Sequence, residues 1–207
     1  MLTPVEHAGL VKFNLRINNY SYYILFAIMA RVEIIVGCMF SGKSTELIRR
    51  ISRYKAIDKD CLVINSSLDT RTEGASTHSG THIRATHVSH LMELTDKQEY
   101  RSASVIGIDE AQFFSDLVEF VYTCEKDDKI LIIAGLDGTS ERKPFGHIHE
   151  CLCLCESITK LTAMDMISKD STLASFTKRI IPISDSTIDI GGTDKYIAVS
   201  RKNFLTN

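Results

Sequence analysis

The sequence predicts an α/β fold: a P-loop NTPase-like parallel sheet flanked by helices, followed by a small β-rich C-terminal subdomain. Continuous apolar runs alternate with helical stretches, and strands that are apolar throughout are typical of parallel sheets covered on both faces. After about Lys160 the pattern changes to short β-type runs with Ser- and Thr-rich turns. The 207 residues suffice for one such domain with a small appendage.

Each element is expected from its local pattern. Short apolar runs predict strands, and a stretch whose arginines form a polar face predicts the first helix. Residues 66–87 are polar, contain glycines and show no clear period, so we expect a loop there. The expected elements are strands at residues 32–36, 61–65, 104–110 and 129–135, and helices at residues 43–54 and 116–125.

An apolar segment at residues 20–30 precedes the first expected strand. Arg31 and Glu33 interrupt it, so it is shorter than the ~20 residues that span a bilayer. No clear small-residue cleavage motif of a secretory signal follows it. We therefore expect no membrane partner. We interpret residues 1–30 as an extension that either precedes a natural start at Met29 or is poorly ordered.

Residues 37–44 read G-C-M-F-S-G-K-S and match the phosphate-loop pattern G-x-x-x-x-G-K-S between an expected strand and an expected helix. Such a loop turns successive backbone N–H groups toward phosphate oxygens at the positive end of a helix. Lys43 would reach the β- and γ-phosphates of ATP, and the Ser44 hydroxyl would bind Mg²⁺. The expected ATP-binding residues are Gly37, Cys38, Met39, Phe40, Ser41, Gly42, Lys43 and Ser44.

The strand expected at residues 104–110 ends in Asp109 and Glu110, at the edge of the sheet where open α/β folds bind ligands. Neighbouring residues of an extended strand point to opposite sides, so the two acids are expected to have different tasks. Asp109 would orient the metal and its waters, and Glu110 would accept a proton. Together with the phosphate loop, this pattern fits motors, switches and kinases alike.

Composition restricts the partners and the compartment. Lys and Arg number 24 against 26 Asp and Glu, a formal net charge of -2, which argues against a non-specific nucleic-acid binder. The six cysteines form no C-x-x-C pair, so we interpret them as free thiols of a cytoplasmic ATP-using protein. Cys151, Cys153 and Cys155 alternate and are expected to be small buried side chains, with a metal or redox role as the alternative.

Six longer motifs narrow the choice among motors, switches and kinases. They read G-C-M-F-S-G-K-S-T-E-L-I-R-R, V-I-G-I-D-E-A-Q-F-F, L-D-G-T-S-E-R-K-P-F-G, K-L-T-A, S-F-T-K-R and I-G-G-T-D-K-Y. In this order, and over roughly residues 30–204, they closely resemble the thymidine kinases of the cellular and poxvirus type. The resemblance implies transfer of the ATP γ-phosphate to the 5′-hydroxyl of thymidine or deoxyuridine in nucleotide salvage for DNA synthesis. It also implies a homotetramer.

The resemblance further implies roles for individual residues. Glu110 would be the catalytic proton acceptor, and Phe113 would pack on the base. Residues 187–191 resemble a lasso loop that grips the pyrimidine through backbone groups, and Asp69 and Arg71 resemble another active-site stretch. From the chemistry alone, Arg71 and Arg179 are candidates for cancelling charge on the γ-phosphate. The implied substrate-binding residues are Gln112, Phe113, Ser140, Thr177, Thr187, Ile188, Asp189, Ile190, Gly191 and Tyr196. The implied division is an extension at 1–30, a P-loop kinase domain at 31–160 and the lasso subdomain at 161–207.

The chain departs from the family at a metal site. The family's lasso subdomain holds a structural zinc in two C-x-x-C pairs, and the corresponding positions here are Asp165, Ser168, Ser200 and Asn203. Serine and asparagine are poor substitutes for thiolate ligands, so we expect no zinc. Two outcomes are open. Either packing holds the subdomain together, or the lasso loop frays and nucleoside affinity falls.

Three smaller departures concern single residues. Ser140 stands where the family has an aromatic residue near the nucleoside, a loss of about 1–3 kcal/mol of apolar contact. Cys38 replaces a proline and Ala111 a glycine, and both changes look tolerable. These departures leave an alternative from another class: a nucleotide-binding homologue with weak or no turnover that acts in regulation or oligomer formation. A nucleic-acid motor would need a basic surface, which the charge balance argues against.

Overall fold

The computed structural model describes residues 30–68, 84–182 and 191–206, and the backbone alone of strands at 4–7, 10–17, 20–27, 75–76 and 82–83. Of these strands, β1 (Pro4–His7), β2 (Leu10–Ile17) and β3 (Tyr20–Ala27) form an antiparallel sheet of their own. Within the described residues, no helix is both long enough and apolar enough to span a membrane.

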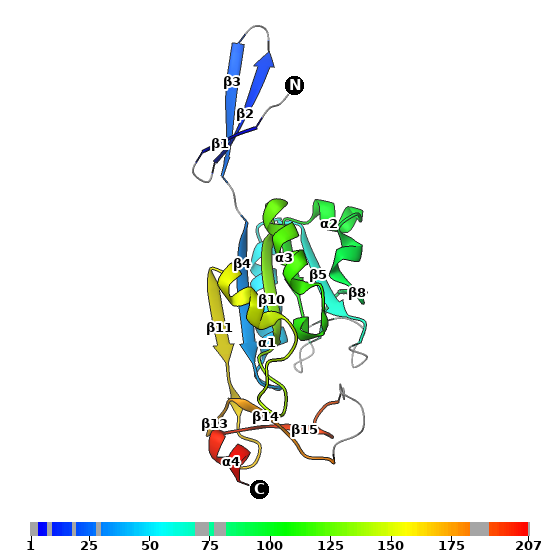
Figure 1. Ribbon diagram of the computed structural model, residues 1–207, viewed down its shortest axis with the longest axis vertical. Helices are drawn as coiled ribbons and strands as arrows, with labels where there is room; N and C mark the ends of the chain where they lie inside the picture. The colour runs from blue at the N-terminus through cyan, green and yellow to red at the C-terminus, as the bar shows by residue number, and fades with distance from the viewer. Residues whose placement is uncertain are drawn as a thin grey trace.

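Six parallel strands form the central sheet, in the spatial order β11-β4-β10-β9-β5-β8 (Figure 1). The strands are β4 (Arg31–Gly37), β5 (Cys61–Ser66), β8 (Thr86–Val88), β9 (Val105–Ile108), β10 (Ile130–Leu136) and β11 (Ser157–Leu161). The four strands expected from apolar runs are the four inner ones, which confirms the predicted fold class. The two edge strands, β8 and β11, were not expected.

The sheet is covered on both faces because successive residues of each strand point in opposite directions. Helix α1 (Lys43–Lys55) packs through Leu47, Ile48 and Ile51 against one face, where Ile35 of β4 also lies. The other core contains Ile34 of β4 and the buried side chains of α3 (Leu117–Lys126). The short helices η1 (Leu91–Leu94), α2 (Gln98–Ser102) and η3 (Ile148–Leu154) contribute buried side chains to this second core.

Two sequence-based expectations need correction. The loop expected at residues 66–87 is wrong at both ends, because Ser66 belongs to β5 and Thr86 begins β8; between them lies the pair β6 (Ala75–Ser76) and β7 (His82–Ile83). The three alternating cysteines lie on and just after η3, a 3₁₀ helix, so only Cys151 is buried while Cys153 is exposed and Cys155 half-buried. A helical turn does not bury every second residue.

The C-terminal subdomain follows β11 and lies beyond the carboxyl ends of β4 and β11 (Figure 1). Its strands pair as β12 (Ala163–Met164) with β13 (Leu173–Ala174) and as β14 (Phe176–Arg179) with β15 (Tyr196–Val199), both antiparallel, and helix α4 (Arg201–Leu205) ends it. The expected change to short β elements is confirmed. Its buried apolar residues include Ala163, Ala174, Ala198 and Val199, and the three alanines pack with Cys38 of the phosphate loop.

Phe120 offers a test of the core. Its ring is fully buried on α3 and meets Tyr100 with ring centroids 5.8 Å apart. We expect Phe120→Ala to lower the free energy of unfolding by about 3–5 kcal/mol, because it removes apolar contacts and leaves a cavity. Tyr122→Ala on the same helix, where the side chain is 46% exposed, should cost about 0.5 kcal/mol or less. Equal urea midpoints for the two variants would contradict this packing.

Candidate active site at the carboxyl edge of the sheet

The loop between β4 and α1 turns sharply at two glycines. Gly42 adopts φ 84° and ψ 21° immediately before Lys43, the first residue of α1. Gly37 has φ 156°, and a Cβ there would come within 2.5 Å of the Leu161 carbonyl oxygen. The first N–H groups of an α-helix have no partner within the helix and carry its positive end. The loop therefore fits a phosphate group.

Ser41 provides an independent indication of a ligand. It is 9% exposed, and its Oγ finds no hydrogen-bond partner in the part of the chain that the structure describes. A buried hydroxyl left without a partner costs about 1–3 kcal/mol. Such a group is expected where a ligand supplies the missing hydrogen bond. The donor set of this loop is thus consistent with an ATP phosphate.

Lys43 places a buried positive charge at this edge. Its side chain is almost fully buried, and its Nζ donates a hydrogen bond to the Cys38 carbonyl oxygen at 2.8 Å. Burial lowers the pKa of Lys43, and the nearby charges of Glu110, Asp109 and Asp137 oppose that shift. Three carboxylates, two in the loop after β9 and one in the loop after β10, are therefore close enough to act on one ammonium group.

Asp109 directly follows β9 and is buried. Burial and the neighbouring Glu110 carboxylate raise the pKa of Asp109, and a hydrogen bond with the Ser44 side chain opposes the shift. Its Oδ1 also accepts a hydrogen bond from the Glu110 backbone N–H at 3.0 Å. The Ser44 hydroxyl and the Asp109 carboxylate thus lie side by side, and oxygen atoms of this kind are what Mg²⁺ prefers as ligands.

Glu110 does not lie on an extended strand, and that premise of the sequence analysis is wrong. Strand β9 ends at Ile108, and Glu110 has φ 50° and ψ 40°, immediately before the 3₁₀ turn η2 (Ala111–Phe113). Its Oε2 accepts a hydrogen bond from Gln112 Nε2 at 2.5 Å. Gln112 is buried, and its Oε1 accepts from the Leu136 backbone N–H at 2.9 Å. Gln112 therefore ties the Glu110 carboxylate to the end of β10.

Asp137 belongs to the same group of charges, although the sequence analysis did not select it. It follows β10, it acts electrostatically on Lys43, and its Oδ2 forms an ion pair with Lys160 Nζ at 2.7 Å. The signal was present: Asp137, like Asp109, is an acid just after a buried parallel strand, at the edge where ligands bind.

The residues expected at the nucleoside are spread over three elements. Phe113 of η2 is half-buried and meets the Phe145 ring edge-on, with centroids 5.6 Å apart. Ser140 is half-buried in the loop that follows β10. In the C-terminal subdomain, the Tyr196 hydroxyl accepts a hydrogen bond from Arg179 Nη2 at 2.9 Å. Thr187, Ile188, Asp189 and Ile190, as well as Asp69 and Arg71, lie outside the described residues, whereas Gly191 is the first described residue after that gap.

Thr177 and Cys38 connect the phosphate loop to the C-terminal subdomain. Thr177 is buried on β14, and its Oγ1 accepts a hydrogen bond from the Met39 backbone N–H at 3.0 Å. The Cys38 thiol donates to the Ala174 carbonyl oxygen at 3.4 Å. Burial raises the pKa of Cys38, so the thiol keeps its proton and remains a donor. Sequence reasoning missed both contacts, because they join residues more than 130 positions apart.

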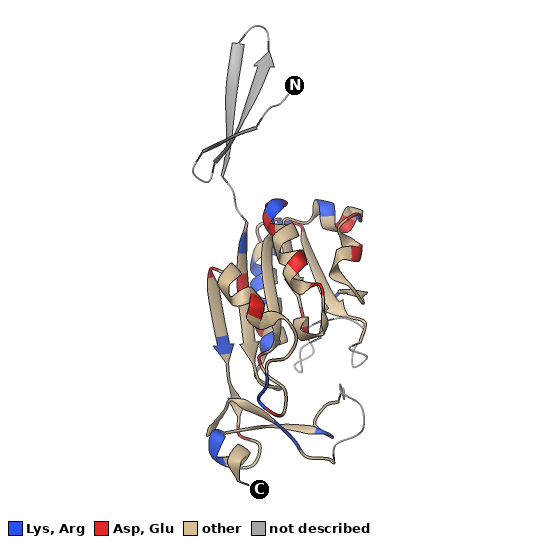
Figure 2. Cartoon of the chain, in the orientation of Figure 1, with Lys and Arg blue, Asp and Glu red and all other residues tan. Residues whose placement is uncertain are grey.

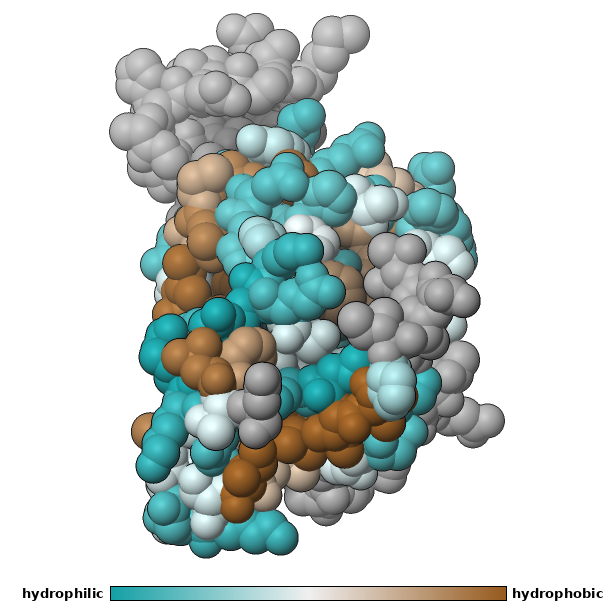
Figure 3. Space-filling view, turned by 60° about the horizontal axis from the view of Figure 1, so that its bottom comes forward, coloured by the Kyte–Doolittle hydropathy of each residue, from teal (hydrophilic) through white to brown (hydrophobic). Residues whose placement is uncertain are grey.

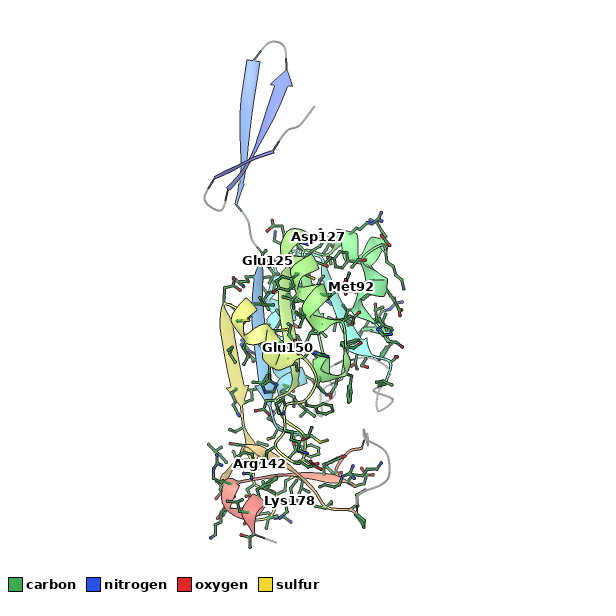
Figure 4. The ribbon with its side chains drawn as sticks, in the orientation of Figure 1. Met92, Glu125, Asp127, Arg142, Glu150 and Lys178 are labelled. Atoms are coloured by element: carbon green, nitrogen blue, oxygen red, sulfur yellow. The ribbon has the colours of Figure 1, made fainter. Side chains whose placement is uncertain are left out.

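The loop after β10 is fastened to the same subdomain by stacked rings and cations. The Arg142 guanidinium lies 4.6 Å from the Phe204 ring centroid and 5.8 Å from that of Phe176. The Arg201 guanidinium also lies over the Phe176 ring, 4.9 Å from its centroid. Figure 4 labels Arg142 in this loop and Lys178 in β14. Interactions of this kind contribute about 0.5–1 kcal/mol each at exposed sites.

Comparison with known proteins agrees with this geometry. A family model described as "Thymidine kinase" matches residues 30–204, which include every loop described above. The chain is 42% identical over 184 residues to "Thymidine kinase 1" of Dictyostelium discoideum, covering 86% of this chain and 79% of that protein. It is 44% identical to "Thymidine kinase" of myxoma virus (strain Uriarra) and 43% identical to that of vaccinia virus (strain Western Reserve), each covering 84% of this chain and 96% of the relative.

The bond between Thr177 and Met39 can be tested. We expect Thr177→Val to lower the free energy of unfolding by about 1–3 kcal/mol, because a buried backbone N–H loses its acceptor. ATP binding should weaken in the same variant, since Met39 is part of the phosphate loop. Thr177→Ser keeps the hydroxyl and serves as the control. Urea unfolding and ATP titration should separate the two variants, and equal behaviour would show that the bond has no role.

Proposed function

Since this chain belongs to the thymidine kinase family, we propose that it transfers the γ-phosphate of ATP to the 5′-hydroxyl of thymidine or deoxyuridine. The product would be the 5′-monophosphate, dTMP from thymidine, which serves nucleotide salvage for DNA synthesis. One observation carries the proposal: the buried ammonium of Lys43, the Glu110 carboxylate held by an amide, and the start of α1 after a glycine turn lie at one edge of the sheet. Family membership identifies the chemistry, and this edge is where we place it.

ATP would bind at residues 37–44. The backbone N–H groups of this loop and the start of α1 suit the phosphates, and Lys43 would exchange its bond to the Cys38 carbonyl for phosphate oxygens. Ser44 and Asp109 would hold Mg²⁺ with the nucleotide, since both are oxygen ligands side by side. Bound Mg²⁺ would neutralise charge on the β- and γ-phosphates. Phosphoryl transfer asks mainly for positioning and for charge stabilisation, which these residues supply.

Glu110 would take the proton of the 5′-hydroxyl as the hydroxyl oxygen attacks the γ-phosphorus, while the bond from the γ-phosphorus to the bridging oxygen breaks and ADP leaves. A positioned general base contributes typically ~10²–10⁴-fold to the rate. Gln112 would keep the carboxylate in place, since it bonds Glu110 with one end and the β10 backbone with the other. The side chain is therefore restrained before a substrate arrives, which reduces the ordering needed in the transition state.

The base would lie between η2 and the C-terminal subdomain. Phe113 would pack on its ring, with Phe145 as an edge-on support. The Thr177 hydroxyl is already bonded to Met39, so its methyl group is the part available to the thymine methyl. Residues 187–191 and Tyr196 would grip the pyrimidine edge as the lasso loop. Asp69, Arg71 and Arg179 would assist near the phosphates, and Ser140 would offer less apolar contact than an aromatic ring.

We also propose the cytoplasm as the compartment, a homotetramer as the assembly, and neither nucleic acid nor a membrane as partner. The cysteines of the described residues are free, and burial raises the pKa of Cys124 and of Cys151 to about 12, as suits unoxidised thiols. Figure 2 shows Lys and Arg interspersed with Asp and Glu over the α/β part, in line with the formal charge of -2. The division at residues 30 and 160 fits β11 ending the parallel sheet at Leu161.

Glu110→Gln tests the proposed base. The amide keeps the shape of the side chain but cannot accept the proton, so we expect thymidine phosphorylation with Mg-ATP to fall roughly 10²–10⁴-fold. ATP binding should be unchanged. Glu119→Gln, an exposed position on α3, is the matched control and should retain full activity. If wild type were as inert as Glu110→Gln while ATP still bound, the chain would instead be a nucleotide-binding homologue with a regulatory or oligomer-forming role.

Ser44→Ala tests the proposed metal ligand. We expect the Mg²⁺ concentration for half-maximal rate to rise at least about tenfold, because one oxygen ligand is lost. Ser52→Ala, an exposed serine on the same helix, should leave it unchanged. A titration of rate against Mg²⁺ at saturating thymidine measures both. Identical titrations would remove Ser44 from the metal site.

A further inference from the structure

Asp165 carries a buried carboxylate that the proposed reaction does not use. It follows β12 and is only 2% exposed. Aspartate is almost never fully buried unless it is paired, because burial strips water from its charge. An unpaired charge would destabilise the subdomain that contains it, so the partners of this carboxylate identify its role.

Both carboxylate oxygens are fully hydrogen-bonded. Oδ1 accepts from the backbone N–H groups of Ile167 at 2.8 Å and Ser168 at 2.9 Å, within its own turn. Oδ2 accepts from the Ser200 backbone N–H at 2.7 Å and from Asn203 Nδ2 at 2.9 Å, at the junction of β15 and α4. A carboxylate offers about four acceptor sites, so these four bonds, with a further one from the Ser200 hydroxyl, leave none vacant. One side chain thus joins two turns that are 35 residues apart.

The partners are also bonded to one another. Asn203 Nδ2 donates to Ser168 Oγ at 2.8 Å, and Ser200 Oγ accepts from the Asn203 backbone N–H at 3.3 Å as the cap of α4. Asp165, Ser168, Ser200 and Asn203 therefore form one closed cluster, which we name the Asp165 clasp. Burial opposes the ionisation of Asp165, but hydrogen bonds from the Ser200 hydroxyl and from backbone N–H groups outweigh it and hold its pKa below the ordinary range.

The four members of the clasp stand where related subdomains have their four zinc-binding cysteines, and they do not fit zinc. The set contains one carboxylate, two hydroxyls and one amide, in place of thiolates. The one anionic ligand already has all its acceptor sites occupied by hydrogen-bond donors. No group of three or more His, Cys, Asp or Glu suited to a metal occurs among the residues that the structure describes.

The subdomain needs such a fastening, because its own apolar core is small. The buried apolar side chains are three alanines, Val199 and Cys38, whereas Met164, Ile167 and Leu173 are more than half exposed. Figure 3, which views the molecule from this end, shows hydrophobic side chains at the surface between hydrophilic ones. A unit of fewer than about 70–80 residues rarely gains more than about 3–5 kcal/mol from its own hydrophobic core, and the subdomain at 161–207 is smaller than that. Its few buried apolar side chains therefore leave it in need of a further connection.

We propose that the Asp165 clasp takes the place of a structural metal, and that Asp165 is a positioning residue for the nucleoside-binding part of the subdomain. The turn after β12 and the start of α4 are the two ends of the clasp, and β13, β14 and β15 run between them in sequence. These strands carry Thr177 and Tyr196, and residues 183–190 connect two of them. The positioning role depends on the proposed function, whereas the stabilising role does not.

Asp165→Asn is the first test. The amide has nearly the same shape but turns an NH₂ group toward N–H donors on one side, so at least two of the four bonds are lost. We expect a fall in Tm of about 5–10 °C and a rise in the KM for thymidine that exceeds any rise in the KM for ATP. Asp170→Asn is the matched control: this exposed aspartate lies in the same turn and accepts from the Thr172 backbone N–H at 3.2 Å. It should shift neither value.

Two further variants keep the proposal testable if Asp165→Asn does not fold. Asn203→Ala removes one bond to Asp165 and one to Ser168, and should give a smaller fall in Tm. Replacing all four members together (Asp165→Cys, Ser168→Cys, Ser200→Cys and Asn203→Cys) should yield a chain that binds one Zn²⁺ and recovers the wild-type Tm. EDTA should lower the Tm of this variant and leave that of wild type unchanged.

The outcomes of these experiments distinguish the proposal of the Asp165 clasp from the proposed kinase function. A wild-type Tm that falls with EDTA, together with one zinc per chain by elemental analysis, would overturn the clasp. So would an Asp165→Asn melt that equals the Asp170→Asn melt. Because the melting and zinc measurements need no catalysis, the clasp can stand or fall whatever Glu110→Gln shows. An altered Tm with an unchanged KM for thymidine would reject the positioning role alone.

Discussion

The buried ammonium of Lys43 is the charge around which this site is arranged. An ammonium group removed from water is strongly unfavourable unless opposite charges or hydrogen bonds replace the lost solvent. Here the replacement comes from the Cys38 carbonyl oxygen and from three carboxylates: Asp109, Glu110 and Asp137. The order β4-β10-β9 makes this possible, because the phosphate loop, Asp137 and Asp109 follow three neighbouring parallel strands. The order of the strands in the sheet therefore determines which charges surround Lys43.

The inner part of the fold could be read from the sequence, and the reason is physical. A strand with neighbours on both sides and helices on both faces must be apolar throughout. The inner strands β4, β5, β9 and β10 can therefore be recognised in the sequence as continuous apolar runs. Edge strands have no such requirement. In β11, Ser157, Ile158 and Lys160 are exposed, and β8 has only three residues, so neither leaves a recognisable pattern.

Like the fold, the candidate site has some parts that the sequence predicts and others that it does not. The phosphate loop and the acids after β9 are local in sequence, and the reasoning that selected Asp109 would also have found Asp137. The bonds that orient the groups are not local: Gln112 reaches the β10 backbone, Thr177 reaches Met39, and Asp165 reaches Ser200. Each joins residues whose proximity exists only after the chain has folded. Backbone conformation was equally hidden, since nothing in the sequence announces the left-handed Glu110.

Cys38 links the phosphate loop to the C-terminal subdomain. The resemblance to the family implies a proline at this position, whereas this chain has a thiol that packs among Ala163, Ala174 and Ala198 and donates a hydrogen bond to the Ala174 carbonyl oxygen. Proline has no side-chain donor, so this bond is available only with the substitution. These four residues, with Phe40 and Met166 packed against them, form a small core that adjoins the Asp165 clasp. The phosphate loop, which would bind ATP, thus also helps to hold the C-terminal subdomain, which would bind the nucleoside. Weakening the Asp165 clasp should therefore lower the affinity of both proposed substrate sites. The effect should be larger at the nucleoside site, because the phosphate loop is also held by α1.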